Sequence, residues 1–377
     1  MTKSFREHHL FSLLSFFSSH NLPLDAALKK YFSAHRAIGA KDRKFISETI
    51  YAMIRWQGLI DFFCSPPIFW EKRYQLFIQN SWVKAKNDPS VPPHIRVSFP
   101  KSFFHMLSAC FGESKAIEIC SISNEQAPIT VRVNPSKTDR ETLLNSWRTQ
   151  FSVKPTPLSK WGIVFEKRIN FYELPEFKNG LFEVQDEASQ LIADLMEIKE
   201  GDRVLDFCAG AGGKTLAFAH KMNHKGQIYL HDIRTFALAE AKKRLGRAGI
   251  QNAQILPSNS SEKNRLKNKM DWVLVDVPCS GSGTLRRNPD LKWKFDPAAL
   301  PNLIQDQKKI FKEAVEYLSP KGRIVYATCS ILPDENEKQI HYFQEKFGLR
   351  LVGTPFQSFP SRGGMDGFFG AVLERKQ

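Results

Sequence analysis

The sequence predicts an α/β fold: a Rossmann-like domain with a mostly parallel sheet, preceded by a helical domain and a small α/β lead-in. Three observations carry this prediction. From about residue 181 onward, short apolar runs of strand length alternate with longer amphipathic segments, which is the pattern of a parallel sheet with covering helices. Glycines at 210, 212 and 213 lie between one such strand and the next helix. Before residue 123, apolar residues recur largely at helical spacing.

Length and charge limit the class of protein. With 377 residues the chain is long enough for two or three domains, and we expect a helical domain over 1–122, a lead-in over 123–180 and the Rossmann-like domain over 181–377. The hydrophobic content of 42% is ordinary for a globular protein. The net charge of +15 is not, and it favours a polyanionic partner, most often nucleic acid, with an anionic membrane surface second.

The first 122 residues are predicted to be mostly helical. Apolar residues at helical spacing predict helices over 10–17, 22–32, 42–56, 103–110 and 114–121. The first of these is too short and too interrupted by serine for a signal peptide, and no apolar stretch reaches the ~20 residues that a membrane span needs. Basic residues within the third helix form either a solvated face or an RNA-contacting surface.

The remaining elements follow in order along the chain. A strand over 129–134 and a helix over 138–147 make up the lead-in. The Rossmann-like part begins with a strand over 203–208 and a helix after Gly212, and Gly249 is a C-cap signal for a helix over 235–248. Further strands are predicted over 227–232, 253–256, 272–277, 323–328 and 368–374, and further helices over 303–318 and 334–347.

Cysteine usage bears on metal binding and on the cellular compartment. The six cysteines are widely spread, and none forms a C-x-x-C pair or a metal-ligand cluster with histidine, so no metal site is expected. Free thiols in a chain of this size suggest a reducing compartment such as the cytoplasm. A cysteine is most often a small buried hydrophobe, and we assign Cys64, Cys110 and Cys120 to that class.

The glycine-rich loop allows a ligand to approach the backbone at the start of a helix. Asp206 ends the preceding strand and Asp232 ends the following one, where an acid accepts the hydroxyls of a ribose. The pattern predicts an adenosine-containing cofactor, with a nicotinamide-dependent reductase or a purely structural turn as alternatives. The G-x-x-x-x-G-K spacing of a Walker loop is absent. We expect these loop residues at the cofactor: Cys208, Ala209, Gly210, Ala211, Gly212, Gly213 and Lys214.

Two further cysteines lie just past predicted strands. Cys279 follows Asp276 and Pro278, and Cys329 stands between Thr328 and a serine. Strand ends of a parallel sheet line its ligand crevice, so both thiols are placed for covalent chemistry. Carbon 5 of cytosine is a poor nucleophile until a thiolate adds to carbon 6, and a carboxylate such as Asp276 can stabilise the adduct. A second thiol can then help to release the methylated product.

These motifs resemble the RNA cytosine-5 methyltransferases of the Nop2/Sun/RsmB family, most strongly from Leu181 to Lys376. Residues 206–215 resemble the family's first motif, 271–283 its fourth and 326–337 its sixth. The paired Pro-Cys and Thr-Cys motifs are specific to this family among methyltransferases. The N-terminal region resembles the NusB-like RNA-binding domain of the ribosomal RNA members.

The resemblance implies S-adenosylmethionine as the methyl donor and a cytosine in structured RNA as the acceptor. It makes Cys329 the nucleophile, gives Cys279 a part in product release, and places Asp276 against the cytosine and near the cofactor. Many members carry an aspartate near the adenine where this chain has Ser-Asn-Ser. Residues implied at the cofactor therefore include Lys214, Asp232 and Asn259.

Several alternatives remain open from the sequence. Small-subunit (16S) ribosomal RNA is favoured as substrate over transfer RNA because of the helical N-terminal domain. A DNA cytosine methyltransferase would use the Pro-Cys thiol as nucleophile, and the Thr-Cys motif argues against it. A non-catalytic RNA-binding assembly factor has no reason to keep both thiols, and a reductase has no use for them. A monomer is the default expectation.

Overall fold

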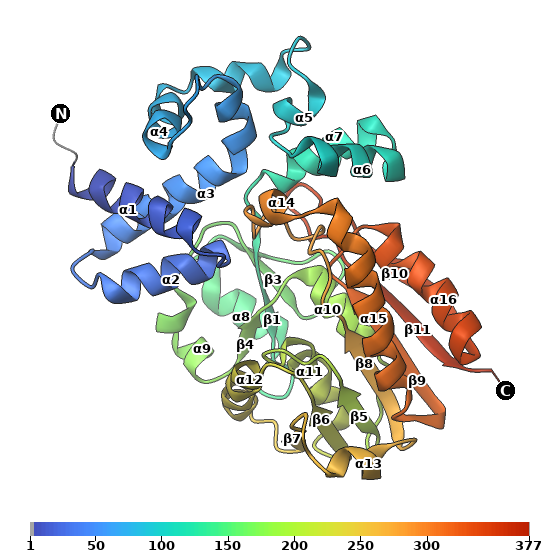
Figure 1. Ribbon diagram of the computed structural model, residues 1–377. Coiled ribbons are helices and arrows are strands. Elements are labelled where there is room, and N and C mark those ends of the chain that lie inside the picture. Colours follow the sequence, from blue (N-terminus) through green and yellow to red (C-terminus); the bar gives the residue numbers. More distant parts are fainter. Residues whose placement is uncertain (1–3, 377) are drawn as a thin grey trace. The chain divides into compact units, whose positions relative to one another are not determined.

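The computed structural model describes residues 4–376, and the chain forms two compact units. The helical unit comprises 1–126 together with 284–299, and the sheet unit comprises 127–283 and 300–377. Among its described residues the helical unit contains helices only, whereas the sheet unit contains two sheets with covering helices (Figure 1). The predicted α/β class, with a mostly parallel sheet and a helical N-terminal region, is confirmed.

The helical unit is built from helices that each bury one apolar face. Ser4 caps the first helix, because its hydroxyl accepts the N–H of Glu7 while the Glu7 carboxylate accepts the N–H of Ser4. Helices are present at every predicted position in this unit, and α4 was not predicted because only Tyr74 of its apolar residues is buried. The helices are α1 Phe5–Ser19, α2 Leu24–Ala34, α3 Ala40–Phe62, α4 Trp70–Gln79, η1 Ser81–Asn87, α5 Pro93–Arg96, α6 Lys101–Phe111 and α7 Glu113–Ser123.

A distant segment completes the helical unit. Residues 284–299 include α14 (Leu291–Lys294) and η4 (Pro297–Ala299), and they follow directly on the loop that carries Cys279. The buried Lys292 ammonium donates to the carbonyl of Arg55 at 2.7 Å, and the Trp293 indole N–H donates to the carbonyl of Ile54 at 2.8 Å. These bonds satisfy carbonyls of α3, so the helical unit depends on chain from beyond the glycine-rich loop.

A small antiparallel sheet opens the other unit. Its strand order is β2-β3-β1-β4, and Trp147 of α8 packs into an apolar cluster with Phe165 and Phe182. The strand predicted over 129–134 and the helix over 138–147 are present, but the other strands are too short for a two-residue period to be recognised. The elements are β1 Ile129–Val133, α8 Arg140–Trp147, β2 Val153–Pro155, β3 Gly162–Phe165, η2 Phe171–Glu173, α9 Pro175–Lys178 and β4 Phe182–Val184.

The large sheet has seven strands in the order β10-β11-β9-β8-β5-β6-β7. Strands β5 to β9 are mutually parallel, while β11 is antiparallel to both β9 and β10. Strand β10 was not predicted, because a glycine, a proline and a register shift interrupt its alternation. The strands are β5 Arg203–Asp206, β6 Gln227–Leu230, β7 Ala253–Ile255, β8 Met270–Asp276, β9 Leu318–Thr328, β10 Leu349–Gln357 and β11 Phe369–Arg375.

Alternate side chains of the central strands face two separate apolar layers. Val273 and Val275 of β8 lie in a cluster with Phe311 and Phe343, on the side of α15 and α16. Leu274 lies in the opposite cluster with residues of α11 and α12. This alternation places helices on both faces, as a parallel sheet requires (Figure 1). The helices of this layer structure are α10 Glu187–Asp194, α11 Gly213–Phe218, η3 Ala219–Met222, α12 Thr235–Ala248, α13 Glu262–Leu266, α15 Leu300–Val315, η5 Pro333–Glu335 and α16 Glu337–Phe347.

Some predicted boundaries shift by a few residues. Strands β5 and β6 end two residues earlier than predicted, because the chain turns into loops in which Ala209 N–H donates to the His231 carbonyl at 2.9 Å. Helix α15 ends at Val315, and the chain enters β9 at Leu318, so the Ser-Pro pair lies in the strand. The predicted C-cap is confirmed, since Gly249 follows α12 with a φ of 80°.

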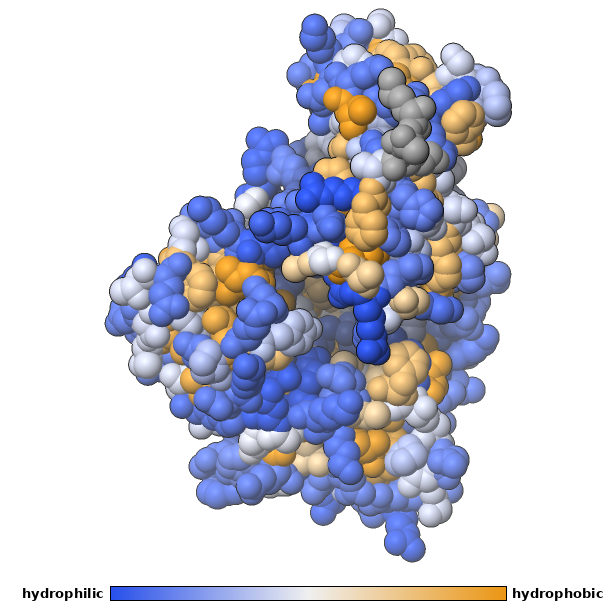
Figure 2. Space-filling view, turned by 90° about the vertical axis from the view of Figure 1, so that its left-hand side faces the viewer, coloured by the Kyte–Doolittle hydropathy of each residue, from blue (hydrophilic) through white to orange (hydrophobic). Residues whose placement is uncertain are grey.

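The face of the molecule in Figure 2 is mostly hydrophilic. Hydrophilic side chains cover most of the face in Figure 2, and hydrophobic ones form separate patches. Within residues 4–376, no helix combines the length and the apolar character that a membrane crossing demands. In the same range, no group of three His, Cys, Asp or Glu side chains is arranged to hold a metal ion.

Core packing of the sheet unit makes one prediction about stability. The rings of Phe311 and Phe343 stack 3.7 Å apart at 4°, and both side chains are fully buried. Phe311→Ala should lower the free energy of unfolding by about 3–5 kcal/mol, because it removes apolar contacts and leaves a cavity. Urea unfolding followed by circular dichroism measures this. Phe5→Ala, at a half-exposed ring, is the control, and equal losses in both variants would contradict the assignment of the core.

Candidate active site

The site lies where the order of the large sheet reverses. The chain runs outward from β5 through β6 to β7, and then returns to place β8 and β9 on the other side of β5. The carboxyl ends of β5 and β8 therefore lie at the switch point of the sheet, which is where open α/β sheets bind ligands. Asp206 ends β5 and Asp276 ends β8, so strand pairing brings these two predicted residues to the same edge.

The glycine-rich loop wraps around the carboxylate of Asp232. Gly210 and Gly212 have φ values of 52° and 75°, which only glycine adopts freely. The Gly210 N–H donates to Asp232 Oδ2 at 2.8 Å, and Arg244 donates to the Ala211 carbonyl at 2.8 Å. A Cβ at Gly213 would meet nothing within 4 Å, so the loop leaves open space on its outer side.

Asp232 also forms a bidentate ion pair with Arg234. The guanidinium donates to both carboxylate oxygens, at 3.0 and 2.9 Å. Burial opposes the charge of Asp232, but the bonds from Arg234 and Gly210 prevail and lower its pKa. The Arg234 side chain is 55% exposed, whereas the Asp232 side chain is only 4% exposed. Ile233 between them is 80% exposed, and sequence reasoning missed it, although its signal is an apolar residue directly after the acid.

A buried ion pair links the loop to β8. The Lys214 ammonium contacts the Asp276 carboxylate. Burial disfavours the charge on Lys214, but Asp276 and, to a smaller extent, Cys329 and Asp206 raise its pKa overall. Asp206 accepts the hydroxyl of Thr215 at 2.7 Å, and its burial raises its pKa to about 7. The first turn of α11 thus carries the cation that balances the acids at the strand ends.

The two thiols meet beside this ion pair. Asp276 of β8 is in register with Ala327 of β9, and the segments that follow run on together. The sulfurs of Cys279 and Cys329 are 3.2 Å apart, and both side chains are half-buried. The hydrogen bond with Cys329, together with burial, raises the pKa of Cys279 well above its ordinary value. The structure therefore brings Cys279, Cys329, Asp276 and Lys214 into one cluster.

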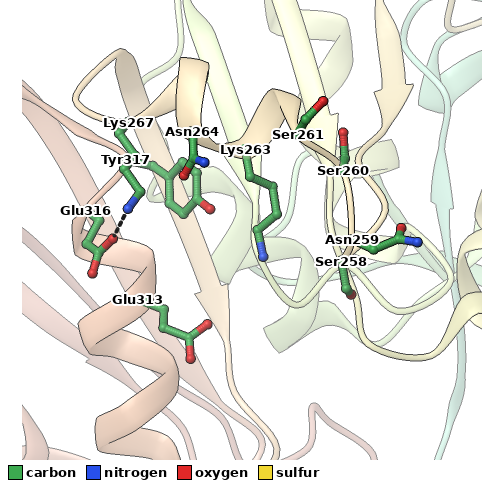
Figure 3. Close-up of a pocket in the computed structure, with 10 residues that line it drawn as sticks. All are labelled: Ser258, Asn259, Ser260, Ser261, Lys263, Asn264, Lys267, Glu313, Glu316 and Tyr317. Carbon is green, nitrogen blue, oxygen red and sulfur yellow. Dashed lines mark ion pairs between the residues drawn. The ribbon is translucent and has the colours of Figure 1, made fainter.

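Two predicted residues lie apart from that cluster. Cys208 packs against the apolar cluster between the sheet and α15, and burial raises the pKa of its thiol. Asn259 lines a shallow pocket beyond β7, with polar residues of the following loop and the end of α15 around it (Figure 3). Lys267 and Glu316 form an ion pair of 2.8 Å at the side of this pocket away from Asn259. The pocket borders the loop of Asp232, since the Ser258 hydroxyl lies 3.4 Å from the Asp232 carbonyl.

Known proteins provide a comparison for this arrangement. A family model described as 16S rRNA methyltransferase RsmB/F matches residues 193–374, and a model of the ferredoxin-like domain of RsmF/B-like methyltransferases matches 99–172. A probable ribosomal RNA small subunit methyltransferase B from Synechocystis is 33% identical over 65% of this chain. The chain spans 56% of the length of that relative, which is less than two thirds.

Two solved structures have a similar fold. The crystal structure of a methyltransferase homolog protein from Pyrococcus horikoshii has a TM-score of 0.67 and 27% identity, and covers 77% of this chain and 100% of its own. The crystal structure of PH0851 has a TM-score of 0.82 over 100% of both chains at 22% identity, which bears on the fold alone.

The raised pKa of Asp206 leads to a prediction about how the stability of the protein depends on pH. The folded protein binds this proton more tightly than the unfolded chain, in which the pKa is 3.8. Its contribution to stability is therefore complete at low pH and is lost as the pH rises from about 4 to about 7, by a few kcal/mol. Asp206→Asn should remove this decline. Urea unfolding at a series of pH values measures the difference, and identical pH slopes in parent and variant would contradict it.

Proposed function

We propose that this chain, which matches family models for the 16S rRNA methyltransferases RsmB/F and for their ferredoxin-like domain, is a member of that family and transfers a methyl group from S-adenosylmethionine to carbon 5 of a cytosine in RNA. Small-subunit (16S) ribosomal RNA is the proposed substrate. The observation that carries the proposal is the pair of thiols 3.2 Å apart at the strand ends, beside the carboxylate of Asp276. Neither a reductase nor a purely structural turn has a use for that arrangement.

The residues around the loop fit S-adenosylmethionine. Asp232 offers carboxylate oxygens to ribose hydroxyls, and the exposed Ile233 beside it offers an apolar surface to an adenine ring. The carboxyl oxygens of Asp206 and Asp276 near the loop are acceptors that suit the cationic sulfonium and ammonium of this cofactor better than the pyrophosphate of a dinucleotide. When bound, the cofactor supplies an electrophilic methyl group.

The thiols and Asp276 supply the remaining chemistry. The Cys329 sulfur forms a bond to carbon 6 of the cytosine, and the electron pair displaced within the ring takes up a proton at nitrogen 3, which faces the Asp276 carboxylate. That proton leaves again when the ring double bond is restored. Carbon 5 becomes nucleophilic and takes the methyl group. Loss of the proton from carbon 5 then restores the ring double bond, and the electron pair of the carbon–sulfur bond returns to Cys329. Cys279 lies within contact of that sulfur and is placed to assist its departure.

Assignments drawn from the sequence complete the proposal. Lys214 holds Asp276 in place from the glycine-rich loop, and Asn259 is the proposed contact near the adenine. The helical region over 1–122 is proposed to be a NusB-like RNA-binding domain, in keeping with the net charge of +15. Transfer RNA is the second candidate substrate, and unmodified transfer RNA belongs in the same assay.

The proposed roles of the two thiols predict different outcomes when each cysteine is replaced. With radiolabelled S-adenosylmethionine and unmodified ribosomal RNA, the parent should label carbon 5 of cytosine. Cys329→Ala should abolish turnover, and Cys279→Ala should leave a protein–RNA adduct that survives denaturing electrophoresis. Cys64→Ala, far along the chain in the helical unit, is the control. If Cys279→Ala abolishes the adduct while Cys329→Ala retains it, the nucleophile has been assigned to the wrong thiol.

The proposed contact of Asp232 with the cofactor leads to a prediction about binding affinity. Asp232→Asn keeps the size of the side chain but loses the charge-assisted acceptors, so the dissociation constant for S-adenosylmethionine should rise roughly ten- to hundredfold. Isothermal titration calorimetry measures it without RNA. Asp271→Asn removes an equal charge at the opposite end of β8 and should leave the affinity unchanged. Equal affinities of Asp232→Asn and the parent would rule out Asp232 as a cofactor contact.

A further inference from the structure

A buried carboxylate joins the two thiol loops from behind. Glu335, in the turn before α16, is fully buried. Its Oε1 accepts the N–H of Ser280 at 2.8 Å and the amide of Gln307 at 2.9 Å. Its Oε2 accepts the hydroxyls of Ser280 and Ser330. Ser280 directly follows Cys279 and Ser330 directly follows Cys329, so one side chain binds both loops.

All the partners of Glu335 in this network are neutral donors. Backbone N–H, amide and hydroxyl groups point their hydrogens at an acceptor, which fits an ionised carboxylate. Gln307 is itself held by Gln339 at 2.9 Å and also donates to the Pro278 carbonyl at 3.1 Å, on the other side of Cys279. Burying a carboxylate costs free energy unless hydrogen-bond donors occupy its acceptor positions. Apolar packing alone does not require such a group, and this favours a functional reason for the network.

The two thiols have different charged neighbours. Cys329 lies on the side of Lys214, close enough for its sulfur to raise the pKa of that ammonium. Cys279 lies on the side of Glu335, whose charge adds to the hydrogen bond with Cys329 and to burial in raising the pKa of Cys279. The titratable groups that face Cys279 are Cys329 and Glu335, with Tyr326 and Asp276 beyond them.

We infer that Glu335 is a positioning residue: its carboxylate binds both thiol loops, holds the two sulfurs against each other and places a negative charge behind the Cys279 loop. This inference rests on the proposed function and assigns the roles of the two thiols to fixed charges. At release, the proton on carbon 5 leaves to water, the carbon–sulfur bond breaks, and its electron pair returns to the Cys329 sulfur. Cys279 keeps its proton and donates a hydrogen bond to that sulfur as it departs, so both sulfurs end in the protonation states in which they began.

The first test needs no RNA and no variant. The parent protein is treated with iodoacetamide over a range of pH, and mass spectrometry of peptides reports alkylation at each cysteine. Cys329 should reach half-maximal alkylation rate at a lower pH than Cys279. The reverse order would overturn the inference, whatever the protein does to RNA, because the probe reads thiol ionisation and not turnover.

The second test removes the charge of Glu335. In Glu335→Gln, the rate of Cys279 alkylation at a fixed pH near 8 should rise roughly tenfold, because the nearby negative charge is gone. Turnover with RNA should fall in kcat, while the KM for S-adenosylmethionine is unchanged. Asp334→Asn is the matched control, since it removes an equal charge one residue away from a carboxylate paired with Lys338 at the surface. Unchanged Cys279 alkylation in folded Glu335→Gln would overturn the inference.

A third variant separates position from charge and serves where Glu335→Gln does not fold. Ser280→Ala keeps the carboxylate but removes one hydroxyl that ties the Cys279 loop to it. The alkylation profile of Cys279 should stay near that of the parent, while kcat falls. Full kcat in Ser280→Ala would overturn the positioning role. Failure of the parent to methylate RNA, with the predicted order of thiol alkylation intact, would instead count against the proposed function alone.

Discussion

The pairing of β8 with β5 on one side and β9 on the other is the constraint on which the whole site depends. It brings Asp206 and Asp276 to one edge, and it carries the chain past Asp276 and Thr328 so that the thiols of Cys279 and Cys329 meet at 3.2 Å. These strands are held by alternating apolar side chains that face helices on both sides. A shift of one residue in the register would move each side chain of the strand to the other face of the sheet. The packing of the core and the geometry of the site therefore depend on the same register.

Charge in the site is arranged around one buried lysine. Three carboxylates lie near the glycine-rich loop; Lys214 pairs with Asp276 from α11, and Arg234 pairs with Asp232. The third, Asp206, has its pKa raised to about 7, chiefly by burial. Behind the thiols, Glu335 adds a further charge that is satisfied by neutral donors alone. In the proposed mechanism, charges on opposite sides of two adjacent sulfurs would give chemically identical groups different roles.

The loop that carries Cys279 runs directly into a segment of the helical unit. The residues after the Cys279 loop leave the sheet unit at Gly283 and return to it at Leu300. Between those points, Lys292 and Trp293 satisfy carbonyls of α3. The helical unit therefore includes a piece of chain that directly follows the Cys279 loop.

The sequence by itself determined the class of fold, most of the helices, and the residues of the loop and thiol motifs, because periodicity, glycine spacing and strand-end acids are local signals. It did not determine the short strands of the small sheet, strand β10, or the place of residues 284–299, because these depend on contacts between segments far apart in the chain. Only the tertiary structure decided which strand ends are neighbours. The contacts of Glu335 and Arg234 were likewise decided only by the tertiary structure. Folding determines which partner a carboxylate or a guanidinium meets, and the neighbouring residues in the sequence do not.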